Sequence, residues 1–191
     1  MLKVFIVIFM MSSHLLANVG DEPHLKKMIA RMLVVGFDQE KLTEKSQIIQ
    51  EIQKYELGGV ILFDRFYNDR NRTKNIRSPK QLQTLTHALQ KAAKKPLLIS
   101  IDQEGGRVER LKSSYGFEAT PSALAIAKAT LADATLSYTA LAKLLHVNGI
   151  NCNFAPVVDV AVNPKNYVIY GLERSYGSDV THVSNYAGVF I

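Results

Sequence analysis

Four short runs of apolar residues, separated by segments with helical patterning, constrain the fold of this chain more than any other feature. The runs lie at 33–37, 58–63, 97–101 and 150–155. Strands that are apolar throughout belong to parallel sheets covered by helices, because both sides of each strand are then buried. The alternation therefore predicts an α/β fold, and a length of 191 residues is typical of a single domain.

Helices are expected between these strands because apolar residues recur there at a spacing of three and four. The expected helices begin near Asp21, cover 44–55, run from Pro79 to a stop at Pro96, fill most of 120–146, and follow Asp179. Ser78 and Pro79 have the residue types of an N-cap and a first helical position.

The first 17 residues have the pattern of a secretory signal peptide. Lys3 precedes an apolar run at 4–11, and Leu-Leu-Ala ends at residue 17. The run is shorter than the ~20 residues that span a bilayer, and the residue after Ala17 is not a cysteine that could carry a lipid. We expect the protein to be exported, periplasmic or secreted, with a cleavage site after Ala17 and without a stable membrane anchor. The alternative is an uncleaved amphipathic segment that tethers the chain to a membrane.

The net charge of +6, from 23 Lys and Arg against 17 Asp and Glu, is concentrated between Asp64 and Lys80. We interpret this segment as a solvated basic loop. Its aromatic residues Phe66 and Tyr67 are adjacent rather than interleaved with the cations, so nucleic acid is not expected as a partner. The single cysteine, Cys152, excludes an internal disulfide, and the histidine spacings give no support for a metal site.

Acidic residues follow the expected strands at the point where each strand ends. Asp64 follows the second strand, Asp102 and Glu104 the third, and Asp159 the fourth. The chain has neither a Gly-x-Gly-x-x-Gly nor a Gly-x-x-x-x-Gly-Lys motif, which an open nucleotide-binding sheet would be expected to carry. The pattern favours an eight-fold β/α barrel, because barrel enzymes place their chemistry at the carboxyl ends of the strands.

The segment 99–110 carries most of the chemistry that the sequence contains. A buried strand there delivers Asp102 and Glu104 before a pair of glycines, and carboxylates beside a close backbone approach suit a sugar. The two carboxylates could form the acid and nucleophile pair of a retaining glycosidase, which needs a separation of ~5–5.5 Å, and the sequence spacing does not decide this. The alternative is a capped turn in which Asp102 pairs with Arg107 or Arg110.

The motif Asp-Gln-Glu-Gly-Gly-Arg-Val at 102–108 resembles the bacterial exo-β-N-acetylglucosaminidase branch of glycoside hydrolase family 3. Three further blocks agree with that family in the same order: 58–63, 153–160 and Glu-Arg-Ser-Tyr-Gly at 173–177. The resemblance implies a TIM (β/α)8 barrel, a sugar substrate containing N-acetylglucosamine, no metal or organic cofactor, and a monomer when full length.

The same resemblance implies that Asp102 binds hydroxyl groups of the terminal sugar and that Arg110 and Arg174 complete this subsite. Glu104 is then a supporting residue, and Asp159 is structural. The alternative for Arg174 is a purely structural ion pair with Glu173 or Asp159.

No catalytic residue is assigned within the chain. The Lys-His-Phe-Pro-Gly-His-Gly block of the family, its Asp and His acid/base pair and its Asp nucleophile are absent from the 191 residues, so we expect them beyond residue 191. Four strand–helix units are half of an eight-fold barrel. We therefore expect 18–191 to be the N-terminal half of a barrel domain, inactive alone.

In its full-length form the enzyme would release terminal β-linked N-acetylglucosamine from peptidoglycan fragments with retention, through a covalent glycosyl-enzyme. Two alternatives stay open. One is a β-glucosidase or other exo-glycosidase of the same family, and the other is a non-catalytic sugar-binding or degenerate fragment.

Overall fold

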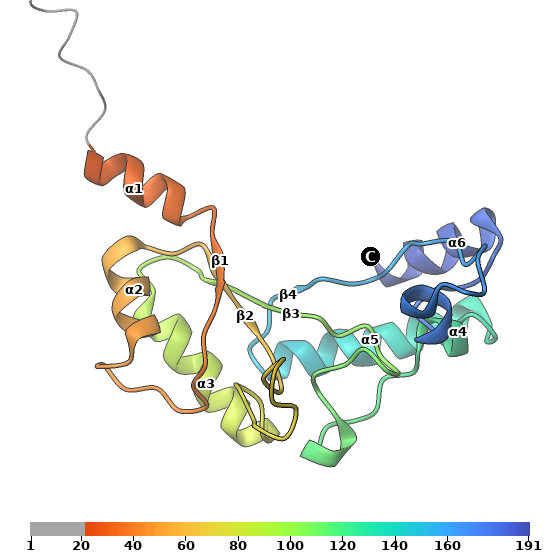
Figure 1. The fold of residues 1–191 in the computed structure, drawn as a ribbon, viewed down its shortest axis with the longest axis horizontal. Helices are drawn as coiled ribbons and strands as arrows, with labels where there is room; N and C mark the ends of the chain where they lie inside the picture. Colours follow the sequence, from red (N-terminus) through yellow and green to blue (C-terminus); the bar gives the residue numbers. More distant parts are fainter. Residues whose placement is uncertain (1–21) are drawn as a thin grey trace, which may run out of the picture.

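A four-stranded parallel sheet forms the centre of the molecule (Figure 1). The computed structural model describes residues 22–191. The strands lie in chain order across the sheet: β1 (Val34–Gly36), β2 (Gly59–Leu62), β3 (Leu98–Ile101) and β4 (Cys152–Asn153). Val60 of β2 lies opposite Val35 on one side and Ile99 on the other. The predicted α/β fold with a parallel sheet is confirmed.

The fourth strand is shorter than the apolar run predicts. It covers two residues, Cys152 and Asn153, and the backbone N–H of Phe154 still donates to the Ile101 carbonyl at 2.8 Å. Pro156 follows closely, and its lack of an N–H group prevents the ladder from continuing. Cys152 in this strand is half-buried.

The helices follow the expected order, with one expected segment divided into two. They are α1 (Glu22–Ala30), α2 (Gln47–Tyr55), α3 (Pro79–Ala92), α4 (Ala123–Ile126), α5 (Leu131–Val147) and α6 (Val180–Phe190), with a 3-10 turn η1 (Ser113–Tyr115) and a π-helical turn η2 (Tyr167–Gly171). The Ser78 hydroxyl accepts a hydrogen bond from the Gln81 N–H. The Asp179 carboxylate caps α6 in the same way, by accepting from the His182 N–H at 2.8 Å. Both predicted helix starts are confirmed.

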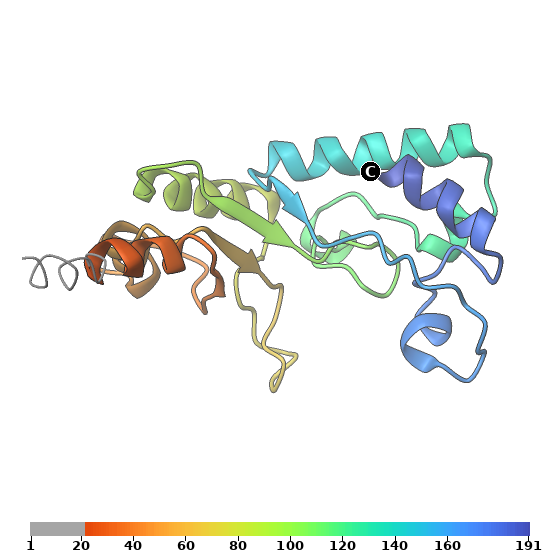
Figure 2. The ribbon, with the colours of Figure 1, turned by 90° about the horizontal axis from the view of Figure 1, so that it is seen from above.

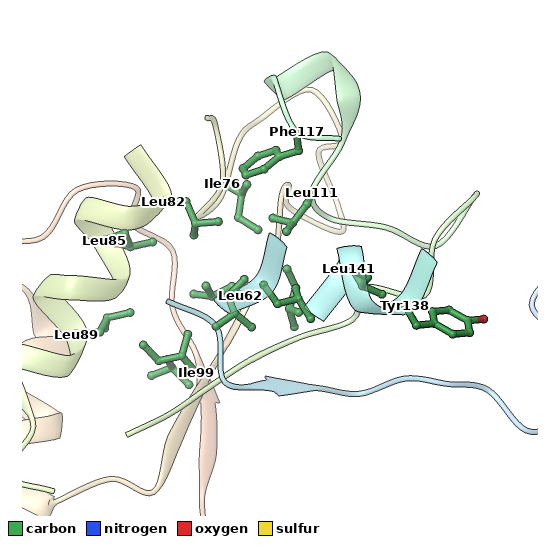
Figure 3. Close-up of a cluster of buried hydrophobic side chains, with 14 of the residues drawn as sticks. Leu62, Ile76, Leu82, Leu85, Leu89, Ile99, Leu111, Phe117, Tyr138 and Leu141 are labelled. Carbon is green, nitrogen blue, oxygen red and sulfur yellow. The ribbon is translucent and has the colours of Figure 1, made fainter. Parts of the chain in front are cut away.

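The core lies between the sheet and helices α3 and α5, which run along the same side of the sheet in Figure 2. Its side chains come from the apolar strands and from the predicted stripe of α3 (Figure 3). Leu62, Leu82, Leu89 and Ile99 are all 0% exposed. Burying a side chain of this size contributes about 1.5–3 kcal/mol, so this interface is the main source of stability of the sheet.

Helix α1 does not bury the apolar stripe that its sequence contains. Leu25, Met28 and Ile29 are each about half exposed within the described part of the chain, and α1 lies at the β1 edge of the molecule in Figure 1. Its hold on the fold is partly ionic, because Lys27 and Arg31 both pair with Glu56 at the end of α2.

Glu56 gives this contact a predictable pH dependence. Hydrogen bonds from Arg31 and Lys27 lower the pKa of its carboxyl group from 4.5 to about 2. A carboxyl group whose pKa is lowered by folding stabilises the folded state above its unfolded pKa, and this stabilisation disappears as the pH falls through the folded value. We expect Glu56→Gln to have a smaller drop in thermal unfolding midpoint between pH 4.5 and pH 2 than the unchanged chain. An equal drop in unfolding midpoint for the two chains over this pH range would contradict a stabilising role for the Glu56 carboxylate.

The predicted signal peptide, 1–17, lies outside the described residues. Within 22–191, none of the helices combines the length and the apolar character needed to cross a membrane.

Candidate functional site

The candidate site lies where β2 and β3 end, with side chains contributed by four segments of the chain. Asp64 follows β2, and Asp102 and Glu104 follow β3, as the sequence predicts. Asp159 lies beyond β4 and is exposed; its backbone carbonyl accepts a hydrogen bond from the Ser175 hydroxyl at 2.5 Å.

Gln103 organises the loop that follows β3. It is 0% exposed, and its Oε1 accepts hydrogen bonds from the N–H groups of Arg110 at 2.8 Å and Leu111 at 3.0 Å. Its Nε2 donates to Thr120 Oγ1 at 3.2 Å, and its backbone N–H and C=O both bond to the side-chain amide of Asn153. A buried amide with all its groups satisfied is rigid, so Gln103 fixes where Arg110 returns to the end of β3. The sequence pattern alone indicates no role for Gln103 or Asn153.

Asp102 pairs with Arg110 across this loop. Arg110 Nη2 donates to Asp102 Oδ2 at 3.0 Å, and the two side chains are 20% and 27% exposed, respectively. Arg110 Nε is buried without a hydrogen-bond partner in residues 22–191. Of the two pairings left open, the structure contains the one with Arg110, because Arg107 donates instead to the carbonyl of Gly171 at 3.3 Å. The pair retains exposed atoms that a ligand can reach.

Arg174 pairs with Glu104, not with Glu173 or Asp159 as the structural alternative had it. Its Nε and Nη2 donate to the two carboxylate oxygens of Glu104, both at 2.7 Å, in a bidentate fork. These hydrogen bonds raise the pKa of the guanidinium, and the nearby charges of Asp159 and Asp102 act in the same direction. Since Asp102 acts on Arg174, the two acid–arginine pairs share one electrostatic environment.

The backbone before Arg174 is held in an uncommon conformation. Glu173 has a φ of 58°, in the left-handed region, which costs a residue other than glycine roughly 1–3 kcal/mol. Its carboxylate accepts a hydrogen bond from the Ser122 hydroxyl at 3.0 Å, and its carbonyl accepts from Leu124 N–H at 3.3 Å. These contacts hold the turn that delivers Arg174 to Glu104.

Asp64 has a partner that the sequence does not indicate. It is 3% exposed and forms ion pairs with Lys112 and, at 3.8 Å, with Arg65. Lys112 belongs to the segment after β3 that Gln103 positions. Its contact with Asp64 joins residues 48 positions apart and depends on the buried side chain of Gln103. The spacing of residues along the sequence therefore gives no signal for this ion pair.

The arrangement is better suited to binding polar ligands than to acid–base chemistry. Asp102 and Glu104 are each engaged by a guanidinium, which occupies carboxylate oxygens that a proton donor or a nucleophile needs free. In residues 22–191 there is no cluster of three or more His, Cys, Asp or Glu side chains that could hold a metal ion. The geometry therefore offers two fixed arginine–carboxylate pairs at a strand end, a combination suited to hydroxyl and carbonyl groups.

A parallel β/α sheet whose strands lie in chain order, with polar side chains at their carboxyl ends, has the arrangement of the TIM-barrel type of α/β fold. The comparison with known proteins gives the family. Residues 24–191 match the Glycosyl hydrolase family 3 N terminal domain, and the chain belongs to this family.

Curated relatives agree with this assignment. Beta-hexosaminidase A of Pseudoalteromonas piscicida is 37% identical over 146 residues, which are 72% of this chain and 23% of that protein. Beta-hexosaminidase of Vibrio cholerae is 34% identical over 142 residues, which are 73% of this chain and 38% of that protein. The chain thus spans well under half the length of these relatives.

Solved structures give the same result in three dimensions. A glycoside hydrolase family 3 β-N-acetylglucosaminidase from Paenibacillus sp. matches with a TM-score of 0.75 and 31% identity, over 87% of this chain and 30% of that chain. NagZ from Neisseria gonorrhoeae, in complex with N-trifluoroacetyl-D-glucosamine, matches with a TM-score of 0.69 and 26% identity, over 83% of this chain and 44% of that chain.

Proposed function

We propose that this chain supplies the terminal-sugar subsite of an exported bacterial glycoside hydrolase. Its full-length form releases terminal β-linked N-acetylglucosamine from peptidoglycan fragments, with retention of configuration. Asp102 and Arg110 bind hydroxyl groups of that sugar, and Arg174 orients a further oxygen.

One observation carries this proposal: the end of β3 holds two acid–arginine pairs, Asp102 with Arg110 and Glu104 with Arg174. Each guanidinium is fixed by a carboxylate yet keeps about a fifth of its side chain exposed, so it is preorganised for a neutral polar ligand. Relatives that share this part of the chain are named beta-hexosaminidase, which supports N-acetylglucosamine as the sugar.

Hydrolysis itself is assigned to residues outside these 191. The resemblance implies a covalent glycosyl-enzyme formed on an aspartate that the sequence given does not contain, with a separate acid/base pair. We therefore propose that the 191-residue chain binds the sugar without cleaving it. The predicted signal at 1–17 supports export.

The test compares this chain with a full-length form that contains it, using 4-nitrophenyl glycosides. We expect the full-length form to release 4-nitrophenol from the N-acetyl-β-glucosaminide far faster than from the β-glucoside, and the 191-residue chain to release none. In the full-length form, Asp102→Ala should lower kcat/KM by about 10- to 100-fold, since hydrogen bonds to charged groups contribute about 1.5–3 kcal/mol.

Glu118→Gln is the matched control, because Glu118 is an exposed carboxylate outside the site. Turnover by the 191-residue chain would contradict the proposal that this chain binds the sugar without cleaving it. Equal rates on the glucoside would favour the broader exo-glycosidase, and sugar binding without turnover by the full-length form would favour the non-catalytic alternative.

A further inference from the structure

The basic segment after β2 is largely exposed, as its composition suggests, and it folds as a hairpin. Arg65 and Thr73 form an antiparallel bridge, and the N–H of Phe66 donates to the carbonyl of Arg72 at 3.1 Å. We call residues 63–75 the basic hairpin. In Figure 2 it extends from the end of β2, away from α3 and α5.

A buried asparagine anchors the base of the basic hairpin. Asn75 is 0% exposed. Its Nδ2 donates to the carbonyls of Phe37 at 3.0 Å and Gln39 at 3.1 Å, and its Oδ1 accepts from the Phe63 N–H at 3.0 Å. The backbone that carries the cations of the basic hairpin is therefore fixed at its base. This reduces the conformational entropy that the hairpin loses when a ligand binds.

A cleft of about 330 Å³ lies between the basic hairpin and the loop after β3, and Arg110 is one of its lining residues. The ring of Phe63 joins the two walls, with Lys74 Nζ at 5.1 Å and the Arg110 guanidinium at 5.6 Å from its centre. Because Arg110 also pairs with Asp102 of the proposed sugar subsite, the cleft borders that subsite at Arg110.

The cleft carries an excess of positive charge. Arg65, Arg70, Lys74 and Arg110 line it together with the carboxylate of Asp64, which pairs with Lys112. Lys74 also pairs with Asp38 at 3.2 Å and Arg110 with Asp102, and the cations still outnumber these carboxylates. Arg70 forms no ion pair with any residue from 22 to 191 and is exposed. A cleft that is lined by cations and aromatic rings of low dielectric constant raises the local concentration of anions. A neutral sugar would gain no binding energy from this positive charge.

We infer that this cleft binds a carboxylate that the substrate carries next to its terminal sugar. The inference rests on the proposed function, because it places that sugar at Asp102 and Arg110. Muramic acid and the acidic residues of peptide stems both provide a carboxylate in this position. The guanidinium of Arg70 is the group that would receive it, and the ammonium of Lys74, which also pairs with Asp38, lines the same cleft.

The experiment measures ligand affinity on the immobilised 191-residue chain. The probes are diacetylchitobiose, which is neutral, and N-acetylglucosaminyl-N-acetylmuramic acid, which carries one carboxylate. We expect the anionic disaccharide to bind 5- to 10-fold more tightly at low ionic strength, and 0.5 M salt to remove most of this difference. Arg70→Gln should abolish the difference and leave the affinity for diacetylchitobiose unchanged. Lys143→Gln, a cation of α5 outside the cleft, should change neither.

Any other result of these affinity measurements contradicts a specific part of the inference. Equal affinity for both disaccharides overturns the carboxylate site and leaves the sugar subsite standing. An anionic preference that survives Arg70→Gln overturns the assignment to the cleft. Inorganic phosphate that removes the preference at low millimolar concentration assigns the cleft to free oxyanions instead of the substrate. Failure of both sugars to bind overturns the inference together with the proposed function.

Discussion

Replacing Gly105 with alanine is expected to destabilise this domain by about 3–5 kcal/mol, a large part of the 5–15 kcal/mol that stabilises a typical domain. Gly105 has a φ of 94°, a conformation that side chains disfavour, and a Cβ there would lie 2.1 Å from the carbonyl oxygen of Pro121. The added Cβ would clash with backbone atoms of Pro121 rather than with the end of a flexible side chain, so the loop after β3 would have to move. Urea unfolding monitored by circular dichroism measures the loss, and a change below 1 kcal/mol would contradict this account.

Gly188→Ala provides the matched control for this substitution. Gly188 lies inside α6, and nothing lies within 4 Å of the position that a Cβ would occupy. Alanine is favoured over glycine in a helix by about 0.8–1 kcal/mol, so the same chemical change should be stabilising there. Opposite signs at the two positions would show that the close approach of backbones, and not the added methyl group, determines the result at Gly105.

The parts of the fold that the sequence predicts are those set by local patterns. The apolar run at 58–63 becomes β2, the stripe of Leu82, Leu85 and Leu89 faces the core, and Ser78 caps α3. These outcomes follow from burial and from hydrogen bonds between residues a few positions apart, which spacing alone encodes.

The parts that the sequence does not predict depend on partners distant in the chain. Glu104 meets Arg174 across 70 residues, and Lys112 meets Asp64 across 48. Buried Gln103 and Asn75 have no local pattern that distinguishes them from exposed amides, yet each fixes a loop of the site. Asp102 and Glu104 are thus recognisable as candidate site residues, and Arg110 as one of two possible partners of Asp102, whereas the pairing of Glu104 with Arg174 is not recognisable.

Replacing Glu104 with glutamine is expected to weaken sugar binding about 10-fold although Glu104 is not assigned a contact with the sugar. The carboxylate is 8% exposed and holds both Nε and Nη2 of Arg174. A glutamine amide offers one acceptor and places an NH2 group against the guanidinium, so the fork is lost. Breaking one side of a buried pair also costs about 3–5 kcal/mol, and about 2 kcal/mol is expected here because Arg174 is partly exposed.

The pair formed by Glu40 and Arg77 separates geometry from burial. Its two nitrogen–oxygen distances are both 2.8 Å, about as short as those between Arg174 and Glu104, but the Arg77 side chain is 65% exposed. Exposed pairs contribute about 0–1 kcal/mol, so Glu40→Gln should cost little stability and leave the affinity for diacetylchitobiose unchanged. Equal losses of stability and affinity in Glu40→Gln and Glu104→Gln would mean that burial does not explain the contribution of the ion pair between Glu104 and Arg174. Lost stability with unchanged affinity after Glu104→Gln would instead assign Glu104 to the fold alone, because a residue that positions Arg174 for the sugar must change both quantities.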